Sequence, residues 1–242
     1  MNTPAARANE RPVLVSGKLG YIANMLKSFR NQMVFLSQFG KQFETTGSLI
    51  ASSRFLAKSI TRYLAVRTDQ PVRVLECGPG TGAFTNQIVR QLRPGDVFDL
   101  VELNESFVDV LNHRFASENP WKSVRDLSTI HEVPLQDFET PGSYDYVISG
   151  LPLNNFPPKL VAEIMEVYFR LLKPGGMLSY FEYMYIRPVR SRISSGAGGS
   201  RIREIHQIVE SYLAQHRVAR DSVLLNTPPA WVQHLQADLV KE

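Results

Sequence analysis

The apolar positions of this chain follow two different periods. Between residues 18 and 39 they recur at steps of three and four, which predicts an amphipathic helix; its apolar stripe comprises Leu19, Ile22, Leu26, Phe29, Met33 and Leu36. From residue 72 onward, short apolar runs of strand length alternate with helical patterns. This alternation predicts an α/β domain with a mostly parallel sheet.

The same patterns divide the chain into three parts. Residues 1–16 show no periodicity and read as a mobile leader, and residues 17–66 carry the N-terminal helices. Residues 67–242 form the main domain. Its strands are expected near 72–76, 97–102, 128–133, 144–149 and 177–186, with helices over 83–92, 104–115, 158–172 and 202–215. Two short strands, near 222–225 and 230–235, are expected to close the sheet as an antiparallel hairpin.

The most informative stretch is V-R-V-L-E-C-G-P-G-T-G-A-F-T at residues 72–85, a buried strand that ends in three glycines. Gly78, Gly80 and Gly82 allow a tight turn and let a ligand lie against the main chain. Glu76 places a carboxylate beside this turn. The spacing is G-x-G-x-G rather than the G-x-G-x-x-G of dinucleotide sites, which points away from a pyrophosphate.

A second carboxylate, Glu102, ends the next expected strand and lies twenty residues after Gly82. This is the spacing at which an acid meets ribose hydroxyls in nucleoside-binding α/β folds. We therefore expect Glu102 to bind a ribose. The alternative for a lone acid in this position is a helix cap.

The fourth strand runs into G-L-P-L-N-N-F-P-P at residues 150–158. Neutral amides at Asn154 and Asn155 suit an amine acceptor, because they can orient its lone pair toward an electrophile while one of them accepts the departing proton. Two adjacent asparagines also occur by chance in a plain proline-rich loop.

The glycine motif, with its acid two residues ahead, resembles the first motif of class I S-adenosylmethionine-dependent methyltransferases. Together with Y-D-Y-V-I-S-G-L-P-L-N-N-F-P and T-G-S-L-I-A-S-S-R-F-L-A-K, it resembles bacterial phospholipid N-methyltransferases, which methylate phosphatidylethanolamine, and their relatives that methylate ornithine lipids. The resemblance covers about residues 30–185. It implies a Rossmann-like class I sheet, mostly parallel with an antiparallel last strand, and an N-terminal amphipathic helical extension.

The resemblance also implies site residues and partners. S-adenosyl-L-methionine would be bound by Glu76, Gly78, Gly80, Gly82 and Glu102, and the acceptor is expected along residues 151–156. Glu182, followed by tyrosines, is a further catalytic candidate because a carboxylate can attract a cationic head group. Related enzymes have an adenine-binding acid after the third strand, and neither Glu132 nor Asp137 occupies that position cleanly. No metal is expected.

Composition constrains the setting more than the chemistry. Lys and Arg number 27 against 23 Asp and Glu, a net charge of +4 that allows an anionic membrane surface or a nucleic acid without requiring either. A single cysteine, Cys77, excludes an internal disulfide and fits a reducing cytoplasm. With no apolar run of spanning length and no signal peptide, we expect a peripheral protein on the inner face of a bacterial cell membrane. Residues 18–39 would contact that membrane.

Two other functions remain open. An RNA adenine N-methyltransferase would also pair asparagine with proline after the fourth strand, but in the order N-x-P-Y, and no additional RNA-binding domain is apparent. The arginines around residues 187–203 lack interleaved aromatic residues, so a nucleic-acid partner is not expected. A membrane-binding scaffold that kept the fold without catalysis is the third reading.

Overall fold

The computed structural model describes residues 47–140, 144–184 and 197–239 of the 242-residue chain. The leader 1–16, the amphipathic segment 18–39 and the arginines at 187, 190 and 192 lie outside these ranges, so what the sequence predicts for them stays a prediction. None of the helices in the described ranges is long and apolar enough to cross a bilayer.

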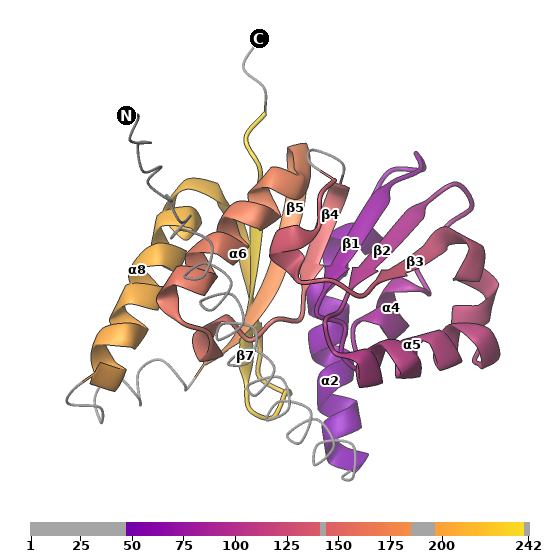
Figure 1. Cartoon of the computed structure of the whole chain (residues 1–242), viewed down its shortest axis with the longest axis horizontal. Coiled ribbons are helices and arrows are strands. Elements are labelled where there is room, and N and C mark those ends of the chain that lie inside the picture. The colour runs from indigo at the N-terminus through magenta and orange to yellow at the C-terminus, as the bar shows by residue number, and fades with distance from the viewer. Residues whose placement is uncertain (1–46, 141–143, 185–196, 240–242) are drawn as a thin grey trace, which may run out of the picture.

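Seven strands form one sheet in the order β3-β2-β1-β4-β5-β7-β6 (Figure 1). The pairs among β1 to β5 are parallel, whereas β7 is antiparallel to both of its neighbours. This confirms the expected sheet and its terminal hairpin. The strands are β1 Arg73–Cys77, β2 Val97–Val101, β3 Ser128–His131, β4 Tyr144–Ser149, β5 Leu172–Tyr183, β6 Arg217–Val223 and β7 Ala230–Gln236.

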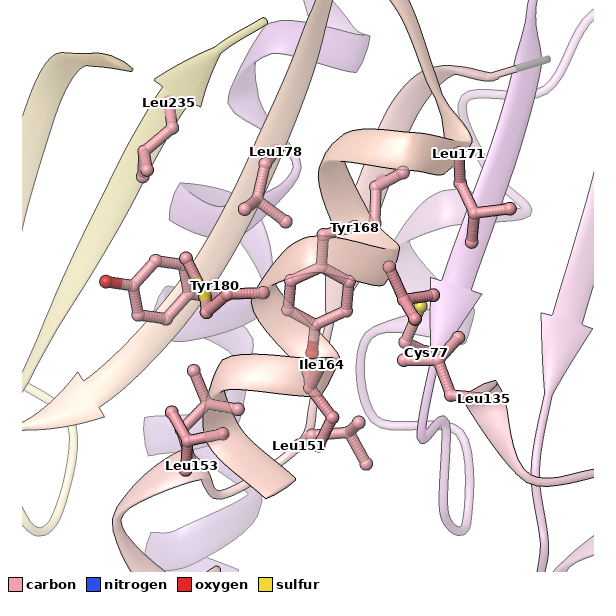
Figure 2. Packing of buried hydrophobic residues seen from close by; sticks show 14 of the residues in the cluster. Cys77, Leu135, Leu151, Leu153, Ile164, Tyr168, Leu171, Leu178, Tyr180 and Leu235 are labelled. Atoms are coloured by element: carbon pink, nitrogen blue, oxygen red, sulfur yellow. The ribbon is translucent and has the colours of Figure 1, made fainter. Parts of the chain in front are cut away.

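Helices cover both faces of this sheet, with α6 and α8 on one side and α2, α4 and α5 on the other (Figure 1). Alternate residues of each strand point to opposite faces, so two apolar clusters form. Figure 2 shows the α6 side, where Cys77, Tyr168 and Leu178 pack together. The helices are α2 Gly47–Ile60, α3 Arg62–Ala65, α4 Thr85–Ile88, α5 Glu105–Ser117, α6 Pro158–Leu171 and α8 Ala197–His216, with 3-10 turns η1 Trp121–Leu127, η2 Leu135–Asp137 and η3 Leu153–Asn155.

Three expected boundaries were wrong. Regular α-helix after the glycines is confined to α4, because i to i−3 bonds such as Gln87 N–H to Phe84 O interrupt the ladder on both sides. The strand β5 begins before the K-P-G-G turn, which forms an irregularity in its pairing with β4. The edge strand β6 begins at Arg217 and stops before Leu224. The sequence pattern does not predict these bounds, because this largely exposed strand carries no clear alternation of apolar residues.

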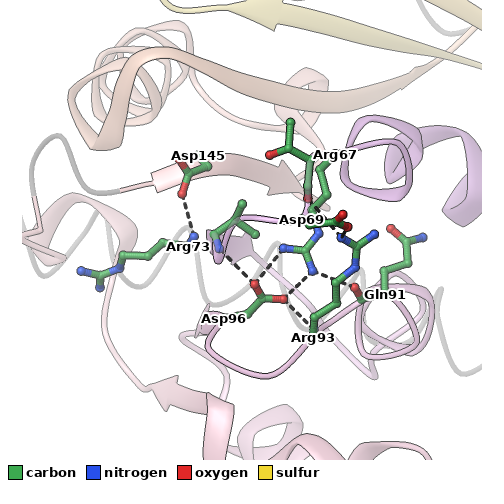
Figure 3. A network of polar contacts seen from close by, with 9 residues as sticks. Arg67, Asp69, Arg73, Gln91, Arg93, Asp96 and Asp145 are labelled. Atoms are coloured by element: carbon green, nitrogen blue, oxygen red, sulfur yellow. Dashed lines mark hydrogen bonds and ion pairs between the residues drawn. The ribbon is translucent and has the colours of Figure 1, made fainter.

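A buried ion pair holds the amino-terminal edge of the sheet (Figure 3). Asp96 is 2% exposed and accepts from both terminal nitrogens of Arg67, and it also accepts from the backbone N–H groups of Val72 and Arg93 at 3.0 and 2.6 Å. Burial by itself would raise the pKa of Asp96, but these bonds outweigh it and lower the pKa. One carboxylate thus joins the end of the helical segment to the starts of β1 and β2.

We expect Asp96→Ala to lower the free energy of unfolding by about 3–5 kcal/mol, because it leaves the Arg67 charge buried without a partner. Asp69→Ala is the matched control: Asp69 also pairs with an arginine, Arg93 at 2.9 Å, but its side chain is fully exposed, so the loss should stay below about 1 kcal/mol. Urea unfolding of both variants measures the difference, and equal losses would contradict a structural role for the buried pair.

Candidate cofactor and acceptor site

The three glycines after β1 all adopt positive φ, at +68° for Gly78, +58° for Gly80 and +91° for Gly82. Residues other than glycine rarely adopt this backbone conformation. A Cβ at Gly78 would collide with Leu151, and one at Gly82 would collide with Trp121, so these two glycines serve close packing as well as the turn. At Gly80 no atom of the described residues lies within 4 Å of such a Cβ. The middle glycine therefore faces open space in which a ligand can lie against the backbone.

Side chains from α5 and η1 support the glycine loop from outside. Arg114 donates from Nη1 to the Thr81 carbonyl at 2.7 Å, and its guanidinium lies 4.2 Å from the centre of the Trp121 ring. The Trp121 indole N–H donates to Asn86 Oδ1 at 3.2 Å. No local sequence pattern predicts this support, because Arg114 and Trp121 lie more than thirty residues after the loop they hold.

The loop brings Glu102 to its backbone. Glu102 is 2% exposed, and it accepts from the Gly80 N–H through Oε2 at 3.0 Å and from the Asn104 N–H through Oε1 at 2.9 Å. Burial raises the pKa of Glu102, while these backbone bonds oppose the rise. Each carboxylate oxygen can accept more than one hydrogen bond. Glu102 therefore retains the capacity to accept from a pair of ligand hydroxyls beside Gly80.

Glu76 lies fully buried at the end of β1 and contacts the start of α4. Its Oε2 accepts from Thr85 Oγ1 at 2.7 Å, whereas its Oε1 has no hydrogen-bond partner among the described residues. Desolvation raises the pKa of Glu76 from 4.5 to about 8, against the opposing effect of Thr85. A buried carboxyl with one unsatisfied oxygen beside an open loop fits a cationic ligand group. Thr85 was not among the predicted site residues, although it closes the G-A-F-T motif.

A pocket opens beside Gly78, between the carboxyl ends of the central strands, the turn after β3 and α6. The residues that line it are Gly78, Val101, Glu102, Leu103, Val133, Leu135, Gln136, Leu151 and Ile164. Among them, Gln136 has the only uncharged polar side chain. The two acids considered for adenine, Glu132 and Asp137, are exposed and do not line this pocket. The amide of Gln136 can donate and accept hydrogen bonds, so it replaces them as the adenine candidate.

The loop after β4 forms the neighbouring wall. Leu151, Leu153 and Phe156 are buried, whereas Asn154 and Asn155 are partly exposed. Arg201 in α8 holds this loop from behind, since its Nη2 donates to the carbonyl oxygens of Asn155 and Phe156 at 2.6 and 3.1 Å. Among the arginines noted around residues 187–203, Arg201 thus lies in α8, and its guanidinium anchors the main chain at this site.

Glu182 lies at the same end of the sheet but within it. It is 5% exposed, and its Oε1 accepts from Gln233 Nε2 in β7 at 2.7 Å. Glu182 thus lies further from solvent than the sequence suggested. The structure brings Glu76, Glu102 and the glycines together, sets Asn154 and Asn155 on the adjacent loop, and keeps Glu182 in the β5–β7 pairing.

A serine–histidine–aspartate set on the α2 side of the sheet has a structural role. His234 is fully buried, with Nδ1 2.8 Å from Ser179 Oγ and Nε2 3.3 Å from Asp221 Oδ2. Desolvation lowers the pKa of His234 to about 4, although Asp221 opposes this. Ser179 is 3% exposed, so no substrate reaches it. Ser59 and Arg62 bond Asp221 as well, and the set fastens α2 to the sheet.

Within the described ranges, no three histidine, cysteine, aspartate or glutamate side chains gather as metal ligands would. The arrangement is instead that of an organic cofactor site: a glycine turn, two buried acids and an apolar pocket at the carboxyl edge of a parallel sheet.

Comparison with known proteins agrees with this geometry. Residues 74–176 match the family described as a methyltransferase domain, and the chain belongs to the class I S-adenosylmethionine-dependent methyltransferases. It is 30% identical to ornithine lipid N-methyltransferase of Singulisphaera acidiphila over 155 residues, 62% of this chain and 77% of that protein. It is 29% identical to ribosomal RNA small subunit methyltransferase A of Pseudomonas syringae pv. tomato over 140 residues, 56% of this chain but only 46% of that protein.

Solved structures share the fold at low sequence identity. The 1,6-didemethyltoxoflavin-N1-methyltransferase of Burkholderia thailandensis, with bound S-adenosylhomocysteine, aligns over 98% of this chain and 93% of its own, at 15% identity and a TM-score of 0.57. The N-methyltransferase NodS of Bradyrhizobium japonicum, also with S-adenosylhomocysteine, covers 76% of this chain and 87% of its own, at 14% identity and a TM-score of 0.53. The methyl donor of this fold is S-adenosylmethionine.

The pKa of Glu76 predicts a specific pH dependence of stability. Because this pKa is higher in the folded chain than in the unfolded chain, the folded state retains a proton that the unfolded state loses above about pH 4.5. The free energy of unfolding should therefore fall by a few kcal/mol between about pH 4.5 and pH 8. Glu76→Gln should lack this fall. Urea unfolding across this range, with the exposed Glu105→Gln as control, measures it, and parallel profiles for wild type and Glu76→Gln would contradict the shift.

Proposed function

We propose that this protein transfers a methyl group from S-adenosylmethionine to the amine of a membrane aminolipid, either ornithine lipid or phosphatidylethanolamine. Successive transfers are compatible with this chemistry, since each product remains an amine until it is quaternary. The N-terminal segment 18–39 is expected to contact the anionic membrane surface from which the acceptor comes.

The observation that carries the proposal is the uncharged loop beside the pocket. Residues 150–156, G-L-P-L-N-N-F, contain no ionisable side chain, and their partly exposed polar groups are the amides of Asn154 and Asn155. A neutral amine needs acceptors that orient its lone pair without binding it as an ammonium ion. The similarity to an ornithine lipid N-methyltransferase, across most of that protein's length, supports the same acceptor.

The residues around the glycine loop fit the methyl donor. The unsatisfied Oε1 of Glu76 suits the donor's ammonium group, and the open space at Gly80 suits a main-chain approach. Glu102 would accept from the ribose hydroxyls, and Gln136 would bond the adenine edge within the apolar pocket. When bound, the donor supplies an electrophilic methyl group on a sulfonium.

On the acceptor side, the chain's own groups position the neutral amine, and methyl transfer leaves its nitrogen as an ammonium that releases its proton to solvent. Arg201 bonds the loop through backbone carbonyls, so the side-chain amides of Asn154 and Asn155 are not needed to hold the loop in place. They are thus available to hold the amine. We give Glu182 no direct contact with the acceptor, because its carboxylate is buried within the β5–β7 part of the sheet and its Oε1 accepts from Gln233.

The ribosomal RNA relatives make methylation of an RNA adenine the second candidate. In the N-x-P-Y pattern of adenine N-methyltransferases, aligned on Pro152, the asparagine would stand at Gly150 and the tyrosine at Leu153. A Cβ at Gly150 would lie 2.6 Å from the Gly78 carbonyl oxygen, so no side chain fits there without backbone movement. Leu153 is 5% exposed and offers no aromatic face. Both observations favour the lipid amine.

Incubation of the purified protein with radiolabelled S-adenosylmethionine should therefore label lipid in vesicles that contain ornithine lipid or phosphatidylethanolamine. Structured RNA is the competing acceptor in a parallel reaction. Label in neither lipid would contradict the proposal, and label in RNA alone would favour the second candidate.

The same assay tests the loop. Asn154→Ala and Asn155→Ala should each lower kcat, by as much as about a hundredfold, through loss of acceptor orientation. Affinity for S-adenosylmethionine should not change. Asn112→Ala, an exposed site on α5, is the matched control and should retain wild-type kcat.

Binding of the donor should also release a proton near pH 7. Glu76, with a pKa of about 8, is mostly protonated in the free protein, and an approaching ammonium group would lower that pKa. Calorimetry of S-adenosylhomocysteine binding in buffers of different ionisation enthalpy measures the release. Glu76→Gln should abolish this dependence on buffer, and a wild type without any would show that Glu76 does not meet the ligand's ammonium group.

A further inference from the structure

Two adjacent leucines lie exposed at the tip of the β6–β7 hairpin. Leu224 and Leu225 each have 68% of their surface exposed, and neither belongs to β6, although the sequence predicted a strand over 222–225. Single exposed apolar residues are ordinary, but a consecutive pair at a protruding turn costs solubility and marks a contact surface.

The tip lies on the same edge of the sheet as the glycine loop. β7 is antiparallel to β5 and starts where β5 ends, with Ala230 opposite Tyr183. The Met184 N–H donates to the Pro229 carbonyl at 2.9 Å, which fixes the turn beside the carboxyl end of β5. The leucines are therefore held at the edge to which the acceptor must come.

A third exposed apolar side chain lies at a similar height on α2. The bond from Ser59 Oγ to Asp221 Oδ2, 2.9 Å long, aligns α2 with β6. On α2, Phe55 lies one helical turn before Ser59. On β6, Val223 lies two residues after Asp221. Each of these steps leads about 6 Å toward the carboxyl edge of the sheet. Phe55 is 41% exposed, so α2 adds an apolar side chain at the level where β6 enters the hairpin.

The exposed charges around this surface are cationic, and Asp221, the one acid on β6, is paired with Arg62. Neither residues 47–68 nor residues 222–237 contain an aspartate or glutamate. Arg54, Lys58 and Arg220 are exposed on the same two elements. Apolar side chains flanked by cations match the interface of an anionic bilayer, where the leucines enter the acyl boundary and the cations meet lipid phosphates.

We infer that Leu224, Leu225 and Phe55 form a second membrane contact that seats the carboxyl edge of the sheet on an anionic lipid surface. This deepens the proposed function, on which it rests, because it explains how a folded domain presents its acceptor loop to a lipid head group. The contact is separate from residues 18–39. It acts by orienting the domain, whereas an N-terminal helix on its own would only tether it.

A labelled cysteine tests the contact directly. Cys77 is the sole cysteine and is fully buried, so a polarity-sensitive thiol dye reports on an introduced cysteine alone. With the dye at Leu225→Cys, emission should shift to the blue when vesicles of phosphatidylglycerol and phosphatidylethanolamine are added, and should shift much less with phosphatidylcholine. Val66→Cys is the control, because Val66 is 78% exposed at the opposite edge of the sheet and should show no shift.

The Leu224→Asp/Leu225→Asp variant should reduce vesicle partitioning roughly tenfold or more, while Val66→Asp should leave it unchanged. An unshifted dye at position 225 on bound protein would overturn the inference, as would a shift that appears with protein concentration alone or with RNA. Methylation of a short-chain, monomeric phosphatidylethanolamine by the wild type tests the proposed function without vesicles. A short-chain ornithine lipid is assayed in parallel; the absence of methylation of both lipids would contradict that function and leave the dye result to decide the contact.

Discussion

Backbone conformation at the end of β1 is the constraint on which the site depends. Three left-handed residues in five positions turn the chain sharply, and packing then determines what stands at each of them. Leu151 and Trp121 close on the outer two, so the loop acts as a junction between β1, the acceptor loop and the η1 turn. The middle glycine, with open space above it, is left for the ligand. The candidate cofactor site and the loop after β4 are thus adjacent because the glycine loop packs against Leu151 of that loop.

Two networks of buried polar groups hold the strands and helices around this junction in place. Asp96 joins the starts of β1 and β2 to the preceding helical segment, and Asp221 with His234 joins α2 to the terminal hairpin. Each carboxylate collects several donors from distant parts of the chain, which compensates for its loss of water. The two networks lie on parts of the sheet that the site does not use. They hold the frame rigid while leaving the carboxyl edge open.

Sequence patterns predicted most of the frame and part of the site. The parallel sheet follows from the alternation of strand and helix patterns. The acids Glu76 and Glu102 follow from their fixed spacing to the glycine turn. Gln136, Arg114 and Arg201 could not be found this way, because their roles depend on which distant segments the fold brings together. The sequence pattern misplaces β6 for a related reason: a largely exposed edge strand carries little apolar signal, whereas the two leucines of the turn resemble a strand.

The close approach at Gly150 has a consequence for how this enzyme can change over time. With 2.6 Å between the place of a Cβ and the carbonyl of Gly78, the first residue of the acceptor loop is confined to glycine as long as β1 and β4 keep their pairing. A descendant that needed an amide at this position would first have to separate two central strands. The asparagine of the N-x-P-Y pattern is therefore blocked here at the level of single substitutions.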